Sequence, residues 1–542
     1  MVDGYTKINA TFKLPDGTNH IDGTPLPTEI PITLSKTPTG LHFNVQDLIG
    51  IKIPGTEFTT TEGKKDWKKF NVNPIEPTMR SVEFLTSVSD VRGNKGELDY
   101  RGYAIGELVE KAKYEEVIYT LLRGDLPNTK EQLSELKSKL AEAAVLDDDV
   151  QKELKNALNV KITEDTDAMA LMNIVVSIMS AHQNHDMKMG TGKAEPEKER
   201  YETALKTTAI MPTLVGLVNA KLDGKLDEFT FAKKSDFEET EFSYAKLLLS
   251  ALTRKPMREL NDETQIKTLD QYLTLHAEHG LNVGTLAAIT AGSAETKAGG
   301  WRPTLAGMQA LAGDLHGAAS VDALQNLIAI SKRPGGSAQE KVDAYFTEIE
   351  EKKAAKEAGT SKEDAKIPGV GHAVYTQLDP RAIAMKKLLN DIAASGTIKG
   401  PGKELIEIAV ALEKKVEESK YFGKKEGGDK KPIHPNVDFY SGVLLNSYLG
   451  VNERLMTPMF AVARNIGWHA HVAEYKRDHG NTGTVLHRPE AFVPPNENNN
   501  MGQTRPVESM EERLPPTTVT GVRMEELFPV INSFVNNYAM AV

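Results

Sequence analysis

The sequence predicts a mostly α-helical protein that begins with a short β-rich segment. From about residue 98, apolar residues recur at helical spacing, as in the run from Ile105 to Ala112. Residues 1–75 are instead rich in Thr, Pro and Gly and contain short alternating runs, which are typical of strands and turns. The chain has 542 residues, 39% of them hydrophobic and 26% charged, which is enough for a large core and about two to four domains.

Further elements follow from periodicity and local composition. A helix is predicted over 168–182, with Thr166 or Asp167 as its cap. Residues 186–200 and 222–242 are polar and charged, which indicates surface insertions. The remaining predicted elements are helical patterns over about 244–330, a charged helix over 339–357 within a polar segment 334–366, a basic Gly-rich loop over 421–434, helical patterns over 441–476, an extended arm over 493–517 and a last helix over about 524–538.

Composition excludes several classes of protein. The net charge is −11 and no long basic tract offsets it, so we predict no nucleic-acid partner. The absence of cysteine excludes disulfides, thiolate catalysis, iron–sulfur clusters and Cys-type zinc sites. No apolar run is long enough to span a bilayer, and the first residues do not resemble a signal peptide. We therefore expect a cytoplasmic protein, or a mitochondrial matrix protein if the source is eukaryotic, without a membrane partner.

One carboxylate and two histidines stand in turns that suit chemistry on carbonyl compounds. Asp438 lies in the segment 435–442, between an apolar run and an apparent helix start, where it is either a helix cap or a base shielded from water. His316 and His372 lie in glycine-containing turns, where the backbone can approach a ligand closely. Together they can remove a proton next to one carbonyl and give a proton to a second one.

The two histidines differ in their surroundings. His316 comes just before a periodic run, so the positive end of that helix would lower the pKa of the imidazole and favour its neutral form. A packed histidine in a turn explains the same pattern equally well. His372 ends a Gly-x-Gly-His turn, which is not a dinucleotide fingerprint because Val374 stands where a third glycine belongs.

Three arginines are candidates for binding anions. Arg381 follows Asp-Pro in a turn soon after the second histidine. Arg464 lies on an otherwise apolar helix face, where it needs an anionic partner, either a structural carboxylate or a substrate. Arg488 follows a polar loop, and a solvated charge explains it as well. We predict no metal site, because the HAEH run at 276–279 has neither a thiolate nor an HExxH pattern to support it.

The order and spacing of these motifs resemble the citrate synthase family. Each motif is modest alone, whereas their joint order is specific and covers roughly residues 80–490 apart from the insertions. The matching segments are 96–105, 114–127, 276–282, 315–317, 371–372, 379–381, 436–442, 464 and 488–489.

The resemblance implies a fold of two helical domains with a cleft that closes on the substrates. A large domain would comprise residues 76–316 and 436–542, the second part carrying the C-terminal arm. A small helical domain over 317–435 would be inserted in it, and residues 1–75 would form the β-rich start.

The resemblance also implies a reaction, the condensation of acetyl-CoA with oxaloacetate followed by hydrolysis of citryl-CoA. Asp438 would take a proton from the acetyl group, and His316 would stabilise the charge on the thioester oxygen. His372 would polarise and protonate the ketone of oxaloacetate. The side chains that would hold the substrate carboxylates are Arg381, Arg464, Arg488 and His279.

The family further implies how coenzyme A and a second subunit contribute. Acetyl-CoA would be a co-substrate, with no tightly bound cofactor. The arginine that matches Arg488 reaches into the neighbouring subunit's site, so a dimer would be the smallest complete enzyme. The residues that would contact coenzyme A are Lys366, Pro368, Gly369, Val370, Gly371 and Asn436.

Three other functions share these residues or this scaffold. A 2-methylcitrate synthase would use propionyl-CoA, and one methylene changes discrimination by only about 1–3 kcal/mol. A citryl-CoA lyase cleaves the same carbon–carbon bond. A non-catalytic scaffold, with insertions at 186–242 and 334–366 that mediate assembly, has no need of all three residues His316, His372 and Asp438.

Overall fold

The fold was obtained as a computed structural model that describes most of the central part of the chain. Arg488, the predicted arm over 493–517 and the predicted helix over 524–538 lie outside the described residues. The described parts are strands within residues 6–67 and residues 86–186, 196–238, 241–294, 300–313, 316–362, 365–372, 374–375, 377–398, 400–423, 433–479 and 486–487.

The chain divides into two compact units, residues 1–81 with 489–542, and residues 82–488. The first unit contains short antiparallel pairs of strands, which confirms the predicted β-rich start. Strand β3 is the centre of its three-stranded sheet, with Ile8 opposite Leu34 and Leu34 opposite Phe43. The strands are β1 Thr6–Lys13, β2 Asn19–His20, β3 Glu29–Thr37, β4 Gly40–Phe43, β5 Ile51–Lys52, β6 Glu57–Thr59 and β7 Lys65–Trp67; β1 and β4 pair with β3, β2 with β5, and β6 with β7.

The second unit opens with a small antiparallel sheet that the sequence did not indicate. Strand β9, Glu97–Tyr100, lies between β8, Ser89–Arg92, and β10, Tyr103–Ala104. The helical pattern expected from about residue 98 therefore begins later, at Ile105. The reason is that Leu98 and Tyr100 alternate inward along a strand, a period of two that is short enough to be mistaken for part of the following helix.

The rest of this unit is helical, as predicted. The α-helices are α1 Ile105–Lys111, α2 Tyr114–Arg123, α3 Lys130–Ala144, α4 Asp148–Ala157, α5 Ala168–Asp186, α6 Pro196–Leu222, α7 Lys234–Glu238, α8 Tyr244–Thr253, α9 Glu263–His276, α10 Val283–Ser293, α11 Arg302–Leu311, α12 Ala318–Ser331, α13 Ala338–Glu357, α14 Pro380–Ser395, α15 Pro401–Glu418, α16 Val437–Val443 and α17 Met456–His479. Short 3₁₀ turns are η2 Leu226–Glu228, η3 Met257–Glu259 and η5 Glu453–Leu455, and η4 Leu444–Tyr448 is a π-helical turn.

Local signals explain where several of these helices begin. The carboxylate of Asp167 accepts a hydrogen bond of 2.8 Å from the backbone N–H of Met169, so it is one of the two predicted caps of α5. Ser337 and Glu340 form a reciprocal capping box at the start of α13, the predicted charged helix. The helical stretch predicted from residue 441 starts earlier, because Asn436 caps α16, which begins at Val437.

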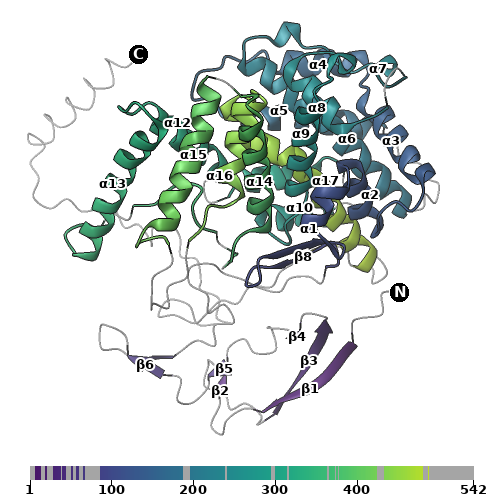
Figure 1. Ribbon diagram of the computed structural model, residues 1–542. Helices are drawn as coiled ribbons and strands as arrows, with labels where there is room; N and C mark the ends of the chain where they lie inside the picture. The colour runs from purple at the N-terminus through teal and green to yellow at the C-terminus, as the bar shows by residue number, and fades with distance from the viewer. Residues whose placement is uncertain are drawn as a thin grey trace, which may run out of the picture. The chain divides into compact units, whose positions relative to one another are not determined.

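Helix α17 is the central element of the second unit (Figure 1). It packs against α2, α5, α6, α9, α10, α11 and α12. Its contact with α11 is unusually close, because a Cβ atom at Gly307 would lie 2.6 Å from the ring of Trp468. This buried helix carries Arg464, so the packing of α17 sets where that arginine points.

Helices α12 to α16 pack mainly on one another, and α13 and α15 lie side by side (Figure 1). This is the part of the chain assigned above to the small domain, although the predicted boundaries at 317 and 435 stay a prediction. Among the described residues, no helix is both long and apolar enough to cross a membrane.

Candidate active site

Asn436 connects the helix that carries Asp438 to the turn that carries His372. Its side-chain oxygen accepts hydrogen bonds from the backbone N–H groups of Asp438, at 3.0 Å, and Phe439, at 3.3 Å. Its side-chain amide donates to the carbonyl of Gly371 at 2.9 Å. One residue therefore both caps α16 and holds the two predicted catalytic segments together, a structural role in addition to the contact with coenzyme A predicted for it.

The turn before His372 also pairs with this segment through its backbone. Val370 forms an antiparallel bridge with Pro435, and the N–H of Gly371 donates to the carbonyl of His434 at 2.8 Å. Gly369 and Gly371 have φ angles of 78° and 105°, which glycine adopts without strain. The glycines predicted to approach coenzyme A thus have a backbone conformation that other residues rarely adopt. Lys366, beside them, is exposed.

The carboxylate of Asp438 lies in the first turn of α16 and forms no hydrogen bond or ion pair with any other described residue. Burial raises the pKa of Asp438 to about 6; the charge of Asp379 adds to this, whereas Arg381 and Arg464 oppose it. At neutral pH the group is therefore ionised, yet it is a stronger base than an ordinary aspartate. The role of helix cap is excluded for Asp438, because Asn436 caps α16, and its role as a base stays a prediction.

His372 is held in one tautomer. Its Nδ1 accepts hydrogen bonds from the backbone N–H groups of Val374, at 2.9 Å, and Tyr375, at 3.1 Å, so the proton of the neutral ring is on Nε2. Burial, and then the charge of Arg381, lower the pKa of His372 to about 4, although Asp379 opposes this. The ring is therefore neutral and presents a single N–H donor.

Arg381 is paired with the residue two positions before it. Its Nε and Nη2 donate to the Asp379 carboxylate at 3.1 and 2.8 Å, and its Nη2 lies 3.5 Å from Nε2 of His372. Burial would lower the pKa of Arg381, but Asp379 outweighs it and the net shift is upward. The arginine is thus permanently charged and rigidly held, and Asp379 compensates part of that charge.

His279 lies beside the same group. Its Nε2 is 3.1 Å from the hydroxyl of Tyr375, and its ring centre is 5.8 Å from that of His372. The spacing of His276 and His279 would place both on one helical face, but α9 ends at His276 and Gly280 turns the chain at φ 68°. The turn directs His279 toward His372, while His276 stays packed on Tyr272.

Arg464 is the cation without a carboxylate partner. It is 1% exposed, its Nε donates to the backbone carbonyl of His276 at 2.8 Å, and its Nη2 has no hydrogen-bond partner among the described residues. No described carboxylate forms an ion pair with it. The structural carboxylate considered above is therefore not found there, and the free Nη2 can bind an anion that enters the site.

His316 lies between α11 and α12. Its Nδ1 is 3.0 Å from the carbonyl of Ala310, which can only accept, so in the neutral ring Nε2 carries no proton. Burial lowers the pKa of His316, and Arg464 adds to this, while the bond to Ala310 opposes it. A Cβ atom at Gly317 would lie 2.5 Å from the carbonyl oxygen of Leu311, so glycine is required where the chain leaves α11.

Electrostatic coupling shows which predicted residues the fold brings near one another. The charge of Arg464 acts on the pKa of His316, of His279 and of Asp438, and the charge of Arg381 acts on those of His372 and Asp438. The residues that the sequence reasoning did not assign are Tyr375 and Asp379. Both lie in segments that carry predicted site residues. Asp379 could have been found, because it is the carboxylate closest in sequence to Arg381.

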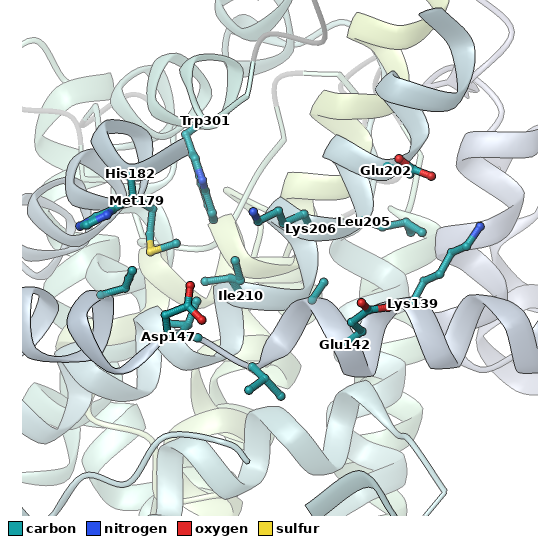
Figure 2. A pocket seen from close by; sticks show the side chains of 14 residues that line it. Lys139, Glu142, Asp147, Met179, His182, Glu202, Leu205, Lys206, Ile210 and Trp301 are labelled. Atoms are coloured by element: carbon teal, nitrogen blue, oxygen red, sulfur yellow. The ribbon is translucent and has the colours of Figure 1, made fainter. Parts of the chain in front are cut away.

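A separate cavity of about 510 Å³ lies among α3, α5 and α6 (Figure 2). Trp301 and Lys206 reach into it from one side and Asp147 from the other (Figure 2). None of the predicted site residues that the structure describes lines this cavity. The candidate active site is thus distinct from it.

Comparison with known proteins decides the family. The family model described as "Citrate synthase, C-terminal domain" matches residues 78–490. The chain belongs to the citrate synthase family. The citrate synthase of Saccharolobus solfataricus is 31% identical over 393 residues, which cover 72% of this chain and 89% of that protein. The citrate synthase of Haloferax volcanii is also 31% identical, over 399 residues and with the same coverage.

Solved citrate synthases share the fold. The structure of the Pyrobaculum aerophilum enzyme matches with a TM-score of 0.61 at 28% identity and covers 85% of this chain and 98% of that one. The Thermoplasma acidophilum enzyme, solved as a ternary complex with carboxymethyl coenzyme A and oxaloacetate, matches with a TM-score of 0.61 at 25% identity over 79% of this chain and 97% of that one. These matches confirm the predicted family and the mostly helical fold.

Proposed function

We propose that this citrate synthase family member condenses acetyl-CoA with oxaloacetate and hydrolyses citryl-CoA to citrate and CoA, with Asp438, His316 and His372 as its catalytic residues. The observation that carries the proposal is the Asp438 carboxylate, which is partly buried, is unpaired among the described residues, and has its pKa raised to about 6. A carboxylate whose charge no described residue pairs suits a base that must take a proton from a weak carbon acid.

The first step is proton transfer from the acetyl methyl group to Asp438. Negative charge then builds on the thioester oxygen and needs a hydrogen-bond donor. His316 is the candidate, but its Nδ1 proton is used by Ala310, and its lowered pKa disfavours a second proton on Nε2. We infer that closure of the cleft releases the Ala310 contact, so that Nδ1–H turns to the thioester.

The second step is attack of the enol on the ketone of oxaloacetate. His372 presents Nε2–H, because two backbone N–H groups occupy its Nδ1. It can polarise the ketone oxygen and give it a proton as the carbon–carbon bond forms. The same two N–H groups, together with nearby Arg381, stabilise the ring when it has lost that proton.

The substrate carboxylates have matching hydrogen-bond donors. Arg464 offers a free Nη2 in a buried environment, and Arg381 and His279 lie around His372. Arg488 of a neighbouring subunit would complete the set, which makes a homodimer the proposed unit. The exposed Lys366 and the glycine turn before His372 are proposed to contact coenzyme A. A cytoplasmic location is likewise a proposal, with the mitochondrial matrix as its counterpart in a eukaryote.

The alternatives differ in the support they have. The relatives are named citrate synthase, and one solved relative holds oxaloacetate with a coenzyme A derivative, so 2-methylcitrate synthesis is not favoured. The same names make a non-catalytic scaffold or a lyase the weaker choice. Thiol release measured with acetyl-CoA and with propionyl-CoA, each with oxaloacetate, separates these functions. We expect faster turnover with acetyl-CoA. No thiol release with either substrate would contradict the proposal that the protein is an enzyme.

Substitution of Asp438 by Asn tests the assigned base. We expect folded protein that binds oxaloacetate with nearly unchanged affinity in calorimetry but turns over at least about 10³-fold more slowly, because the amide cannot take the proton. Asp391→Asn, an exposed aspartate on α14, is the matched control and should keep wild-type turnover. Near-normal turnover of Asp438→Asn would remove Asp438 from the mechanism.

A further inference from the structure

A buried polar network lies behind the candidate site, centred on Glu278. This carboxylate is fully buried, and its Oε1 accepts hydrogen bonds from Ser89, at 3.0 Å, and from Nε2 of His471, at 2.9 Å. Its backbone is held as well, because the Tyr100 hydroxyl donates to its carbonyl at 2.8 Å and accepts from its N–H at 3.1 Å. The mechanism above uses none of these side chains, yet the next residue is His279.

Glu278 packs against the helix face that carries Arg464. Arg464, Gly467 and His471 follow each other at spacings of three and four residues on α17, so they share one side of that helix. A Cβ atom at Gly467 would lie 2.3 Å from Oε2 of Glu278, so only glycine lets the carboxylate approach there. The carboxylate thus lies one turn from the arginine, and no ion pair joins the two.

Both nitrogens of His471 face oxygen acceptors. Nε2 donates to Glu278, and Nδ1 lies 3.3 Å from the hydroxyl of Thr86. That hydroxyl donates its own proton to Glu474 at 2.5 Å, so toward Nδ1 it can only accept. This is the hydrogen-bond pattern of an imidazolium that donates to the Glu278 carboxylate on one side and to a hydroxyl on the other. Glu474, the acceptor of that hydroxyl, is in turn paired with Arg101 at 3.0 Å.

We propose that Glu278 and His471 are positioning residues for the proposed reaction: the His471 cation holds and compensates the Glu278 carboxylate, which leaves the charge and the free Nη2 of Arg464 available to a substrate carboxylate. This inference rests on the proposed function, because it assigns Arg464 to an anionic substrate. Both residues would set the affinity for the substrate without touching it.

The effect of Glu278 and His471 on Arg464 is electrostatic. Opposite charges attract strongly in a buried site, so a carboxylate that faces this side of α17 with no other partner would neutralise the arginine. Burial would raise the pKa of Glu278, but His471 first and Arg464 second lower it below its usual value. His471 also donates to Oε1 of Glu278, so histidine is the main partner of this carboxylate, whereas Oε2 has no hydrogen-bond partner among the described residues. With an imidazolium at His471, the three groups together keep one positive charge.

The test is a double-mutant cycle read out as the oxaloacetate dissociation constant in calorimetry. His471→Gln keeps a donor to Glu278 but removes the cation, so we expect the constant to rise about tenfold, with KM raised more than kcat is lowered. Adding Glu278→Gln removes the carboxylate too and returns the local charge to that of the wild type. The double variant should therefore bind within about threefold of wild type, although it carries one more substitution.

A matched control is His469→Gln on the same helix. His469 is buried, lies 3.0 Å from the hydroxyl of Thr207 and 3.1 Å from that of Thr304, and burial lowers its pKa to about 4, so it contributes no charge. We expect the oxaloacetate dissociation constant of His469→Gln to stay within about twofold of wild type. Wild-type affinity in His471→Gln, or a double variant weaker than His471→Gln alone, would overturn the proposal.

Two further measurements keep the test decisive. If His471→Gln does not fold, Thr86→Val serves instead: it removes the acceptor of Nδ1 with little change in volume, and it should weaken oxaloacetate binding about threefold. Unchanged affinity in Thr86→Val would overturn the proposal as well. Failure of the wild type to bind oxaloacetate would contradict the proposed function itself, which separates the two outcomes.

Discussion

The candidate site contains charged side chains with polar atoms that no described residue hydrogen-bonds. The carboxylate of Asp438 has no hydrogen-bond partner among the described residues, and Arg464 has a free Nη2, whereas neighbouring Arg381 is held by Asp379. Burying an unpaired charge costs stability, so such groups persist where a ligand needs them. The unpaired carboxylate and the unpaired cation match the two tasks of proton removal and carboxylate binding.

The pH dependence of the rate follows from the pKa of Asp438. That group must be ionised to act as a base, and its pKa is raised to about 6 in the folded protein. We expect kcat/KM to fall about tenfold per pH unit below pH 6 and to stay level between pH 7 and 8. A stopped assay in mixed buffers at constant ionic strength checks this, and a rate that stays level down to pH 5 would contradict it.

The same shift predicts a stability effect. A folded-state pKa of about 6 against an ordinary 3.8 means that the folded protein holds this proton more tightly than the unfolded chain does. The group's contribution to stability is therefore complete below pH 3.8 and is lost as the pH rises through 6. Asp438→Asn should unfold at higher urea concentration than wild type at pH 7.5, by up to about 3 kcal/mol, and the difference should shrink toward pH 4. Equal stability at pH 7.5 would contradict this.

At the scale of helices, the site depends on how closely α17 meets its neighbours. Glycines on α11 and α17 remove the side chains that would otherwise hold the helices apart, at Gly307 against Trp468 and at Gly467 against Glu278. Close-packed interiors tolerate added atoms poorly. The position of Arg464 thus depends on glycines that have no chemical role.

Gly307→Ala measures this dependence. The added methyl would lie 2.6 Å from the Trp468 ring, and we expect a loss of about 1–3 kcal/mol in urea unfolding, with weaker oxaloacetate binding because α17 shifts. Gly106→Ala in α1 is the control, since nothing lies within 4 Å of its new methyl. It should be neutral or stabilising by up to about 1 kcal/mol. An unchanged Gly307→Ala would show that the two helices separate easily.

At the scale of the whole molecule, the open question is how many subunits make one site. Arg488 carries the proposed contact across the dimer, and it follows directly on His487, whose backbone N–H donates to Ser293 of α10 at 3.0 Å. The chain just before the arginine is therefore anchored to the second unit. A shared site makes activity a property of the assembly rather than of one chain.

Mixing two inactive variants tests the sharing. Arg488→Ala and Asp438→Asn should each turn over negligibly alone, whereas random exchange of subunits should recover about one quarter of wild-type activity, because half of the dimers then contain one complete site. Differently tagged chains show that exchange has occurred. Exchange without any recovered activity would mean that Arg488 serves its own subunit or none.

The fold class and the family could be predicted from the sequence alone, and the comparisons confirm both, whereas the reacting groups that it indicates stay a prediction. Helical periodicity identified α5 and α13 to within a few residues, since an amphipathic pattern and a cap are local properties of the chain. Asp438, His316 and His372 could be singled out because glycine turns and helix starts have local signatures. The strands β8 to β10 were missed because a period of two over four residues is too short to recognise.

Only the tertiary structure decided how these groups are satisfied. Asn436 takes the cap and leaves the Asp438 carboxylate unpaired, His372 carries its proton on Nε2 while His316 carries it on Nδ1, and Arg381 has a carboxylate partner. These partners are two to six residues away in the chain, yet spacing does not show which of the possible local contacts forms. Arg464 is instead held by the backbone carbonyl of His276, which lies 188 residues earlier. Charge, burial and hydrogen bonding depend on which atoms meet in space. Spacing along the chain cannot reveal them, because the partners of one side chain can lie hundreds of residues away.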